Sequence, residues 1–382
     1  MPGWPDKRFT DLATVLKGSV PYGAGRRRGR VGAYRSSLIK VKSAPDPGLL
    51  GHARVVLDVA DVTAPSLAEP RRRWVSVLVW LGVAPFGLWA VLRIWPHDLD
   101  FLWVQLVAFT PAVVVVSLVA PLVALVTRRW IALVVAVAVS GMLAAEVLPR
   151  AIPGTNTAVS GQPLRVLASN SEVGSVPPEA LVGLVAELRP DALALQELTP
   201  QAVEGLRTAG LGQALPFYAG EAREGAGGSG IYARFPVKMT NNLDYGGFGQ
   251  VKATVDRPGG AFDVVSVHPC APVEKSRHWC WATGLDTLPA PDNTILLGDF
   301  NATLDHAGMR QLLNLGYRDA ADTTGDGLAT TWPVTWDFRG LPIPAVTLDH
   351  ILVDQRTAVH GFSTHVLPET DHRAVFAVVT TF

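Results

Sequence analysis

Residues 294–301 read TILLGDFN, the sharpest of the short motifs in this chain. Its run of apolar residues predicts a buried β-strand, and two polar residues, Asp299 and Asn301, lie at the end of that strand. Because they are two apart, an extended chain points both side chains to the same side. A carboxylate and an amide placed in this way can hold an attacking water and a phosphoryl oxygen. An Asx turn that only ends the strand would give the same pattern.

Four further polar motifs occur between residues 163 and 382, most of them after an apolar run. They are Asn170 in RVLASN, Glu197 in LALQELTP, His268 in VVSVHP, and Asp371-His372 in ETDH. Polar residues that end buried strands tend to point into a shared cleft. Together they supply oxygen ligands for a divalent cation and histidines for acid–base work. We therefore expect metal-assisted hydrolysis of a phosphate ester.

The pattern of residues 163–382 is that of an α/β or α+β domain in which sheet predominates. Residues 177–190 predict a helix with one apolar face, and several apolar runs predict strands. Asp349, in VTLDHILV, is placed to orient His372 through one ring nitrogen, as acids do in catalytic triads. The neighbouring His350 should face the opposite side of the strand, so we expect it to pack in the core.

Three long apolar stretches precede this region, at residues 74–92, 101–126 and 130–148. None contains Lys, Arg or Asp, and Glu146 lies near the end of the third. A transmembrane helix needs about 20 such residues, and membrane helices tolerate prolines such as Pro111 and Pro121. We predict three transmembrane helices within residues 71–149; buried helices of a soluble core are the alternative.

Charges beside the stretches predict their orientation. Arginines 71–73 precede the first stretch and Arg128-Arg129 join the second to the third, whereas RIWPHDLD, between the first and second, has one Arg and two Asp. The positive-inside rule places the N-terminus and the Arg128-Arg129 link in the cytoplasm. Three spans then place residues 150–382 outside.

Cys270 and Cys280 are the only cysteines, and both lie in the region expected outside the cytoplasm. An oxidising compartment would allow them to form a disulfide. Two unpaired buried thiols are the alternative, and the sequence does not decide between them. A structural zinc site would need a second pair of ligands of this kind.

The net charge of zero hides an asymmetry. Residues 1–70 hold 11 Lys/Arg against 6 Asp/Glu, and residues 163–382 hold 15 against 24. We read residues 1–70 as a basic, largely disordered cytoplasmic tail, with VVLDVADV at 55–62 as a short element. Residues 150–162 read as a linker. An acidic catalytic region argues against binding along an extended nucleic acid, which favours basic surfaces.

The ordered motifs of residues 163–382 resemble the endonuclease/exonuclease/phosphatase superfamily, which includes DNase I-like nucleases, sphingomyelinases and inositol-phosphate phosphatases. The resemblance implies a four-layer sandwich of α/β (α+β) class with two packed β-sheets, here preceded by three transmembrane helices. It implies that Glu197 and Asp371 bind metal and that Asn170 and Asn301 bind the substrate phosphate. It also implies catalytic roles for His268, Asp299, Asn301, Asp349 and His372. Arg234, in YARFP, matches a basic position with a structural role.

Departures from the family pattern occur at SNSEVG after Asn170 and at Glu369-Thr370 before Asp371, and the region is short for this family. These put a nuclease assignment in doubt. The three spans also look like those of membrane phosphatases linked to glycopeptide-antibiotic resistance.

The leading hypothesis is a membrane-anchored phosphohydrolase that uses Mg²⁺, with Mn²⁺ as an alternative. It would act outside the cytoplasm on a lipid phosphate or pyrophosphate. A surface-tethered nuclease or other phosphodiesterase and an inactive binding module are the alternatives. The substrate, its leaving group and the oligomeric state stay open.

Overall fold

The computed structural model describes residues 38–42, 56–60, 68–157, 159–335, 337–338 and 340–381. The chain divides into two units, Met1–Arg73 and Trp74–Phe382, with the boundary in the second turn of the first long helix. In the first unit, β1 (Leu38–Lys42) pairs antiparallel with β2 (Val56–Ala60), a strand within the short element predicted at 55–62. Most of the tail that we predicted to be disordered lies outside the described residues.

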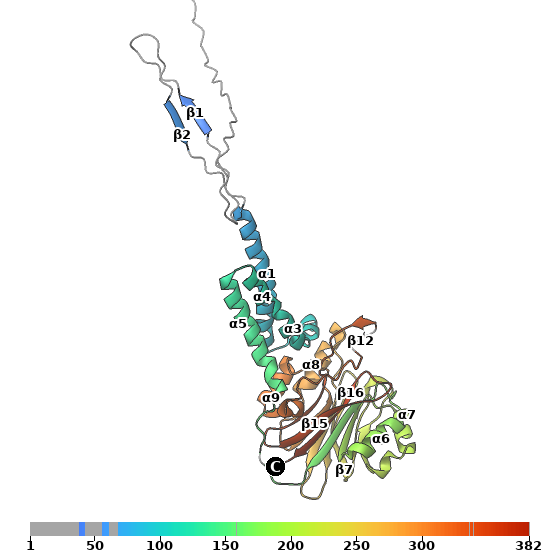
Figure 1. Ribbon diagram of the computed structural model, residues 1–382. Helices are drawn as coiled ribbons and strands as arrows, with labels where there is room; N and C mark the ends of the chain where they lie inside the picture. The colour runs from blue at the N-terminus through green and yellow to red at the C-terminus, as the bar shows by residue number, and fades with distance from the viewer. Residues whose placement is uncertain are drawn as a thin grey trace, which may run out of the picture. The chain divides into compact units, whose positions relative to one another are not determined.

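The second unit begins with helices that correspond to the apolar stretches (Figure 1). They are α1 (Ala68–Ile94), α2 (Phe101–Val107), α3 (Thr110–Ser117), α4 (Val119–Val126) and α5 (Trp130–Val147), followed by the 3-10 turn η1 (Leu148–Ala151). Among the described residues, the helical stretches Arg72–Ile94 and Trp130–Ala151 are each long and apolar enough to cross a membrane. A third span exists only if α2 and α3–α4 count as one bent segment.

The second apolar stretch is thus not a continuous helix as its length suggested. It bends by 65° at the break between Val107 and Thr110. Pro111 lies in the first turn of α3, where its missing N–H costs no hydrogen bond but prevents continuation of α2. Large apolar side chains point outward from these helices: Trp74 is 69% exposed and Ile131 is 77% exposed. Such surfaces suit contact with lipid chains.

Two mixed sheets, each of six strands in the described chain, form the rest of the unit. In order across the first sheet, the strands are β15 (Ala358–Val366), β16 (Arg373–Thr380), β3 (Leu164–Asn170), β4 (Ala192–Gln196), β6 (Ser229–Ala233) and β5 (Phe217–Glu221). Across the second they are β11 (Tyr317–Asp319), β14 (Asp349–Asp354), β10 (Thr294–Asp299), β9 (Phe262–Val267), β8 (Phe248–Val255) and β7 (Val237–Tyr245).

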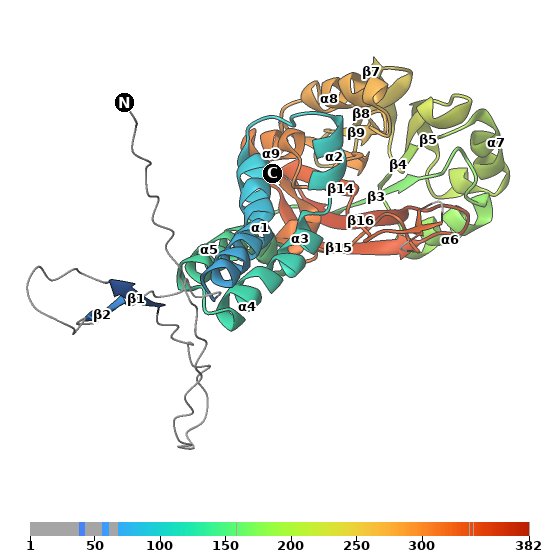
Figure 2. The same cartoon turned by 90° about the horizontal axis from the view of Figure 1, so that it is seen from above.

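The sheets pack face to face and carry helices on their outer faces (Figures 1 and 2). Apolar residues of both sheets, such as Val166 and Leu297, form the central core. α6 (Pro178–Leu188) and α7 (Pro200–Thr208) pack on the first sheet, and α8 (His278–Asp286) and α9 (Ala307–Asn314) on the second. The apolar face predicted for α6 is buried. The predicted four-layer sandwich is therefore confirmed.

Shorter elements complete the unit. They are η2 (Leu211–Gln213), η3 (Gly225–Gly227), η4 (Lys275–Arg277), α10 (Ala320–Thr324), β12 (Asp337–Phe338) and β13 (Leu341–Pro342). The segment predicted as a linker, 150–162, lies against the sheets, because Asn156 Nδ2 donates to the carbonyl oxygen of Val359.

A buried ion network joins the helices to the loop that follows GDFN. Asp305 accepts a hydrogen bond from Arg93 Nε at 2.9 Å and two from Arg150, at 2.9 and 2.7 Å. Arg93 also pairs with Glu146 at 2.9 Å. Nearby, Asp98 accepts from the first backbone N–H groups of α9, which satisfies a helix end that has no side-chain cap of its own.

Candidate active site

The candidate site lies at one edge of the sandwich and draws on both sheets. β3 and β4 run parallel and β16 antiparallel to them, so the ends of β3 and β4 meet the start of β16. β9, β10 and β14 have the same arrangement in the second sheet. The first sheet supplies Asn170, Glu197, Asp371 and His372, and the second supplies His268, Asp299, Asn301 and Asp349. All eight predicted residues are therefore near this edge.

Asp299 Oδ2 is the centre of the cluster. Asn170 Nδ2 donates to it at 3.1 Å, and His268 Nε2 and His372 Nε2 each lie 3.7 Å away. Asn170 Nδ2 also donates to Glu197 Oε1 at 3.2 Å, and His268 Nε2 lies 3.6 Å from that oxygen. The carboxylates of Asp299 and Glu197 thus share the same two nitrogen neighbours, although they come from different sheets.

His372 is held by a second acid. Its Nδ1 lies 2.9 Å from Asp349 Oδ2, and its ring is buried. Burial disfavours the charged ring, but Asp349 and Asp299 outweigh it and raise the pKa of His372 to about 10. His372 is therefore an imidazolium near neutral pH, which makes it a donor and a positive charge beside Asp299.

The other titrating groups of the cluster shift in directions that suit proton transfer. Burial raises the pKa of Asp299, although His372 partly offsets this effect. Burial also raises the pKa of Glu197, against the hydrogen bond from Asn170. Burial lowers the pKa of His268, so this ring is neutral where His372 is charged. The site therefore pairs a buried carboxyl group with one neutral and one charged imidazole.

Asn301 lies beside the cluster with its side chain already engaged. Its backbone N–H donates to Asp299 Oδ1 at 2.8 Å, and its Nδ2 donates to the carbonyl oxygen of Pro269 at 3.2 Å. Asn301 has a φ of 48° and Glu197 a φ of 55°. These are left-handed backbone conformations that residues other than glycine rarely adopt. Strain of this kind concentrates at functional sites.

Asp371 lies at the rim, with two partners that sequence reasoning missed. Trp332 Nε1 donates to Asp371 Oδ2 at 2.8 Å, and the Asp371 N–H donates to Glu172 Oε2 at 2.9 Å. Burial and the neighbouring Asp371 raise the pKa of Glu172. An open groove of about 510 Å³ begins here, lined by Glu172, Asp371 and neighbours. Trp332 and Glu172 lie in no recognisable motif, so the sequence held no local signal for them.

The glycine of GDFN is required by its backbone conformation and by close neighbours in both sheets. Gly298 has a φ of 141°, and a Cβ there would lie 2.4 Å from the carbonyl oxygen of Val267 in the same sheet and 2.7 Å from Gln196 Nε2 in the other. Gln196, beside Glu197, crosses to the second sheet and donates to Ser266 Oγ at 2.8 Å. This buried bond fixes Glu197 and Asp299 relative to one another, and it explains why Gln precedes Glu197.

The donor set fits a hard divalent cation. Among the described residues, Asp299, Asp349 and His372 each offer an atom within 4.8 Å of the others. This group differs from the sequence-predicted pair of Glu197 and Asp371. Because Asp349 and His372 already bond to each other, Glu197, whose side chain is 18% exposed, is the more accessible ligand. Mg²⁺ needs only one or two protein carboxylates beside water and phosphate.

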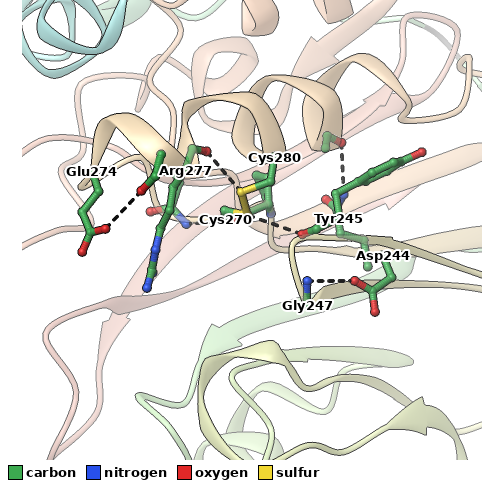
Figure 3. The surroundings of a disulfide bond; sticks show 12 residues. Asp244, Tyr245, Gly247, Cys270, Glu274, Arg277 and Cys280 are labelled. Atoms are coloured by element: carbon green, nitrogen blue, oxygen red, sulfur yellow. Dashed lines mark hydrogen bonds between the residues drawn. A yellow bond between two sulfur atoms is a disulfide. The ribbon is translucent and has the colours of Figure 1, made fainter.

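A disulfide between Cys270 and Cys280 supports the edge of the site from the second sheet (Figure 3). Cys270 lies two residues after His268, and Cys280 lies in α8. The next residue of α8, Trp281, donates from Nε1 to the carbonyl oxygen of Asn301 at 3.0 Å. The pairing that the sequence left open is thus present, and α8 contacts the chain beside two site residues.

Two residues that we expected to be structural lie away from the cluster. His350 Nδ1 lies 2.9 Å from Asp319 Oδ2, and the buried ring packs edge-on against Phe300. Arg234 donates to the carbonyl oxygen of Arg189 at 3.0 Å. Both contacts are internal ties within the fold.

The profile of the Endonuclease/Exonuclease/phosphatase family matches residues 167–372, more than half of the chain. None of the curated proteins matches this chain. Solved structures resemble this chain at low sequence identity. An endonuclease/exonuclease/phosphatase from Beutenbergia cavernae DSM 12333 is 17% identical, with coverage of 58% of this chain and 72% of that chain and a TM-score of 0.47. TDP2 from D. rerio, complexed with single strand DNA product, is 18% identical, with coverage of 58% and 100% and a TM-score of 0.46.

Proposed function

The chain belongs to the Endonuclease/Exonuclease/phosphatase family, and we propose that it is a divalent-metal-dependent phosphohydrolase that is anchored in a membrane and acts on a lipid phosphate or pyrophosphate. The observation that carries the proposal is the contact of Asp299 Oδ2 with Asn170, His268 and His372 beside the Glu197 carboxylate. This family is one of hydrolases of phosphoesters, so the reaction class follows from membership and the substrate is the proposed part.

The proposed roles follow from the charges. Asp299, whose pKa is raised, accepts the proton of the attacking water. The His372 imidazolium, oriented by Asp349, donates to the phosphoryl oxygens and stabilises the charge that develops on them. Asn170 and His268 hold the carboxylates of Glu197 and Asp299 and present nitrogens to the phosphate, and Asn301 fixes Asp299 through its N–H.

Glu197, with Asp371 as a further ligand at the rim, would hold Mg²⁺ or Mn²⁺, which when bound supplies Lewis-acid stabilisation of phosphoryl charge. The carboxylates that would bind the ion belong to the protein's most acidic region, 163–382. A cation there lowers the repulsion between this region and an anionic substrate.

A lipid-linked substrate is supported by the attachment of the site to the membrane helices. Asp305, six residues after Asp299, bonds directly to Arg93 in the last turn of α1 and to Arg150 in η1, which follows α5. The site is thus held close to the bilayer, which raises the local concentration of a membrane substrate. We propose that residues 1–70 form a cytoplasmic tail, that three spans lie within residues 71–149, and that a linker at 150–162 leads to the catalytic domain at 163–382 outside the cytoplasm. We also propose that the protein is similar to the membrane phosphatases linked to glycopeptide-antibiotic resistance.

The test is hydrolysis by the full chain in lipid nanodiscs with Mg²⁺, with Asp299→Asn as the inactive control. Phosphate release is measured for a lipid pyrophosphate, a lipid monophosphate and an inositol phosphate, phosphocholine release for sphingomyelin, and strand cleavage for plasmid DNA. Preferred release from the lipid phosphates supports the proposal. Preferred cleavage of DNA would identify a tethered nuclease, and no reaction with any substrate would favour a binding module.

A further inference from the structure

A cavity of about 250 Å³ lies between the membrane helices and the catalytic domain. The helices line one side of the cavity. This side consists of the break between α2 and α3, of α3 as far as Val115, and of the end of α5 with η1. The 65° bend at this break carries α3 away from the line of α2. Residues 303–305, 327–330 and 344–347 line the domain side. The break in the second apolar stretch therefore borders this cavity, and a straight helix would follow a different path here.

The chemistry of this cavity suits hydrocarbon and does not suit phosphate. Its walls are mostly Ala, Val, Leu, Pro and Phe, and its charged groups, Arg150 and Asp305, bond to each other. With Arg93 and Glu146 the network holds two positive and two negative side chains, so its formal charge is zero. No charge is left over to bind an anion, while an apolar chain would bury apolar surface.

The cavity is adjacent to the candidate active site. Each segment of the domain that lines the cavity is two sequence positions from a residue of the site. Thr303 follows Asn301, Thr347 precedes Asp349, and Thr330 precedes Trp332, which contacts Asp371. Two residues of extended chain span at most about 7 Å. Thr331 Oγ1, next to Thr330, accepts the backbone N–H of Asp349 at 3.0 Å. The wall of the cavity is therefore continuous with the segments that carry the site residues.

The cavity also lies at the end of the spans that meets the catalytic domain. Val115 and Leu148 line it and are 67% and 55% exposed, so they also face outward, where lipid would surround the helices. A chain can enter from the bilayer without passing through water.

We propose that this cavity binds a segment of the single hydrocarbon chain of a lipid phosphate, with the phosphate in the candidate active site. The volume of about 250 Å³ is below the roughly 300–1,000 Å³ of pockets that enclose a whole drug-sized ligand, so it fits part of one chain and leaves the remainder in the bilayer. This inference rests on the proposed function and assigns the part of the substrate that the site residues do not contact.

Alanine-to-tryptophan substitutions test the cavity in the full chain in nanodiscs. Ala112→Trp and Ala345→Trp fill it from the helix side and from the domain side. Ala138→Trp, on an exposed face of α5 outside the cavity, is the matched control. The substrates are a long-chain polyprenyl diphosphate and water-soluble dimethylallyl diphosphate, which carry the same headgroup.

We expect the ratio of KM for the long substrate to KM for the short one to rise at least tenfold in both cavity variants and to stay unchanged in Ala138→Trp. An unchanged ratio in both cavity variants overturns the inference. Agreement between the two sides of the cavity guards against a folding defect in one variant.

Photo-crosslinking separates this inference from the proposed function. A polyprenyl phosphate with a diazirine on its chain reports binding even if no lipid phosphate is hydrolysed. Crosslinks within 108–115 and 344–347 that are lost in Ala112→Trp support the cavity as the chain site. Crosslinks confined to the outward faces of α1 and α4 overturn it, whatever the phosphate-release assay shows.

Discussion

Nδ1 of His372, at the start of the last strand of one sheet, lies 2.9 Å from Oδ2 of Asp349, at the start of a strand of the other. The bond therefore couples a proton-carrying group to the alignment of the two sheets. Its geometry is that of an acid that fixes the orientation and the charge of an imidazole.

Asp349→Asn should shift the pH dependence of turnover. Burial opposes the charge on His372, and Asp349 is the largest influence that raises its pKa to about 10. Without that charge the imidazolium deprotonates at lower pH, so the alkaline limb of the kcat profile moves to lower pH. We expect kcat to fall about 10²–10⁴-fold. Rates from pH 6 to 11 and an NMR titration of the ring measure both effects; an alkaline limb that does not move contradicts the role of Asp349.

Asp299→Asn should abolish turnover and, without metal, stabilise the fold. Burial raises the pKa of Asp299 above 3.8, so the folded state binds its proton more tightly than the unfolded state does. The stability of the wild type therefore decreases as the pH rises from 3.8 through the folded pKa. The neutral amide avoids this loss, and each kcal/mol gained raises Tm by about 2–4 °C.

Two measurements check this prediction. Thermal unfolding in EDTA at neutral pH should give a higher Tm for Asp299→Asn than for the wild type. Phosphate release should be at least about 100-fold lower in Asp299→Asn and in His372→Ala. Release within tenfold of the wild type in either variant would refute the proposed mechanism, and a lower Tm would refute the cost of burying the charge.

Glu197→Ala should weaken metal binding. Both oxygens of this carboxylate accept hydrogen bonds, from Asn170 and the Val173 N–H, which orients it at the cluster. We expect the Kd for Mn²⁺ to rise at least tenfold, or about 1.4 kcal/mol, by calorimetry. Glu187→Ala, an exposed acid on α6, is the control and should bind Mn²⁺ as the wild type does. Equal affinity of the two variants for Mn²⁺ would show that Glu197 is not a metal ligand, and Asp371→Ala would then test whether the acid at the rim of the site is one.

Asp305→Asn should weaken the joint between helices and domain. Burial alone would raise the pKa of Asp305, but Arg150 and Arg93 outweigh it and hold the pKa below 3.8. The contribution of Asp305 to stability is thus complete above pH 3.8 and is lost as the pH falls through the folded pKa. Removal of the charge leaves the buried Arg150 without its carboxylate partner and Arg93 with Glu146 alone, at a cost of about 3–5 kcal/mol near neutral pH.

Thermal unfolding of the full chain in nanodiscs between pH 3 and 7 measures this effect. The wild type should lose stability below pH 4, whereas Asp305→Asn should be less stable throughout and show a smaller loss there. Glu204→Gln removes an exposed ion pair with Arg207 and serves as the control, with no measurable change expected. If both variants unfold alike, the network does not hold the joint.

Replacement of both Cys270 and Cys280 by Ser should destabilise the domain by about 2–4 kcal/mol. The loop after His268 would lose its tie to α8, so kcat should fall as well. Reductant should lower the Tm of the wild type and leave that of the double variant unchanged. A wild type that is insensitive to reductant after complete reduction of its thiols contradicts a stabilising disulfide.

The sequence could predict the edge of the sheets because strand periodicity and polar strand ends are local signals. Asp299, Glu197 and His268 each end an apolar run that forms a strand. The packing of the two sheets therefore brings these residues together, whatever the conformation of the loops. The predominance of sheet and the apolar helices were predictable for the same reason, whereas the two packed sheets were an expectation from the family resemblance. The topology of the spans and the roles of the site residues stay predictions.

Contacts between distant residues could not be predicted in this way. Trp332 bonds to Asp371 and Asp305 bonds to Arg93, but neither pair has a periodic or spaced pattern in the sequence. The bend before Pro111 was also missed, because the apolar composition on both sides of it is the same as that of an unbroken span.

The ion network at Asp305 has a consequence for any form of the chain that lacks the apolar helices. A fragment that begins at residue 163 lacks Arg93, Arg150 and Asp98, and so leaves a carboxylate stranded and an α9 end uncapped six to nine positions from Asp299. Cleavage of the chain before residue 163 is therefore expected to leave the domain less stable. Enzymology and crystallisation should therefore begin from the intact chain in lipid.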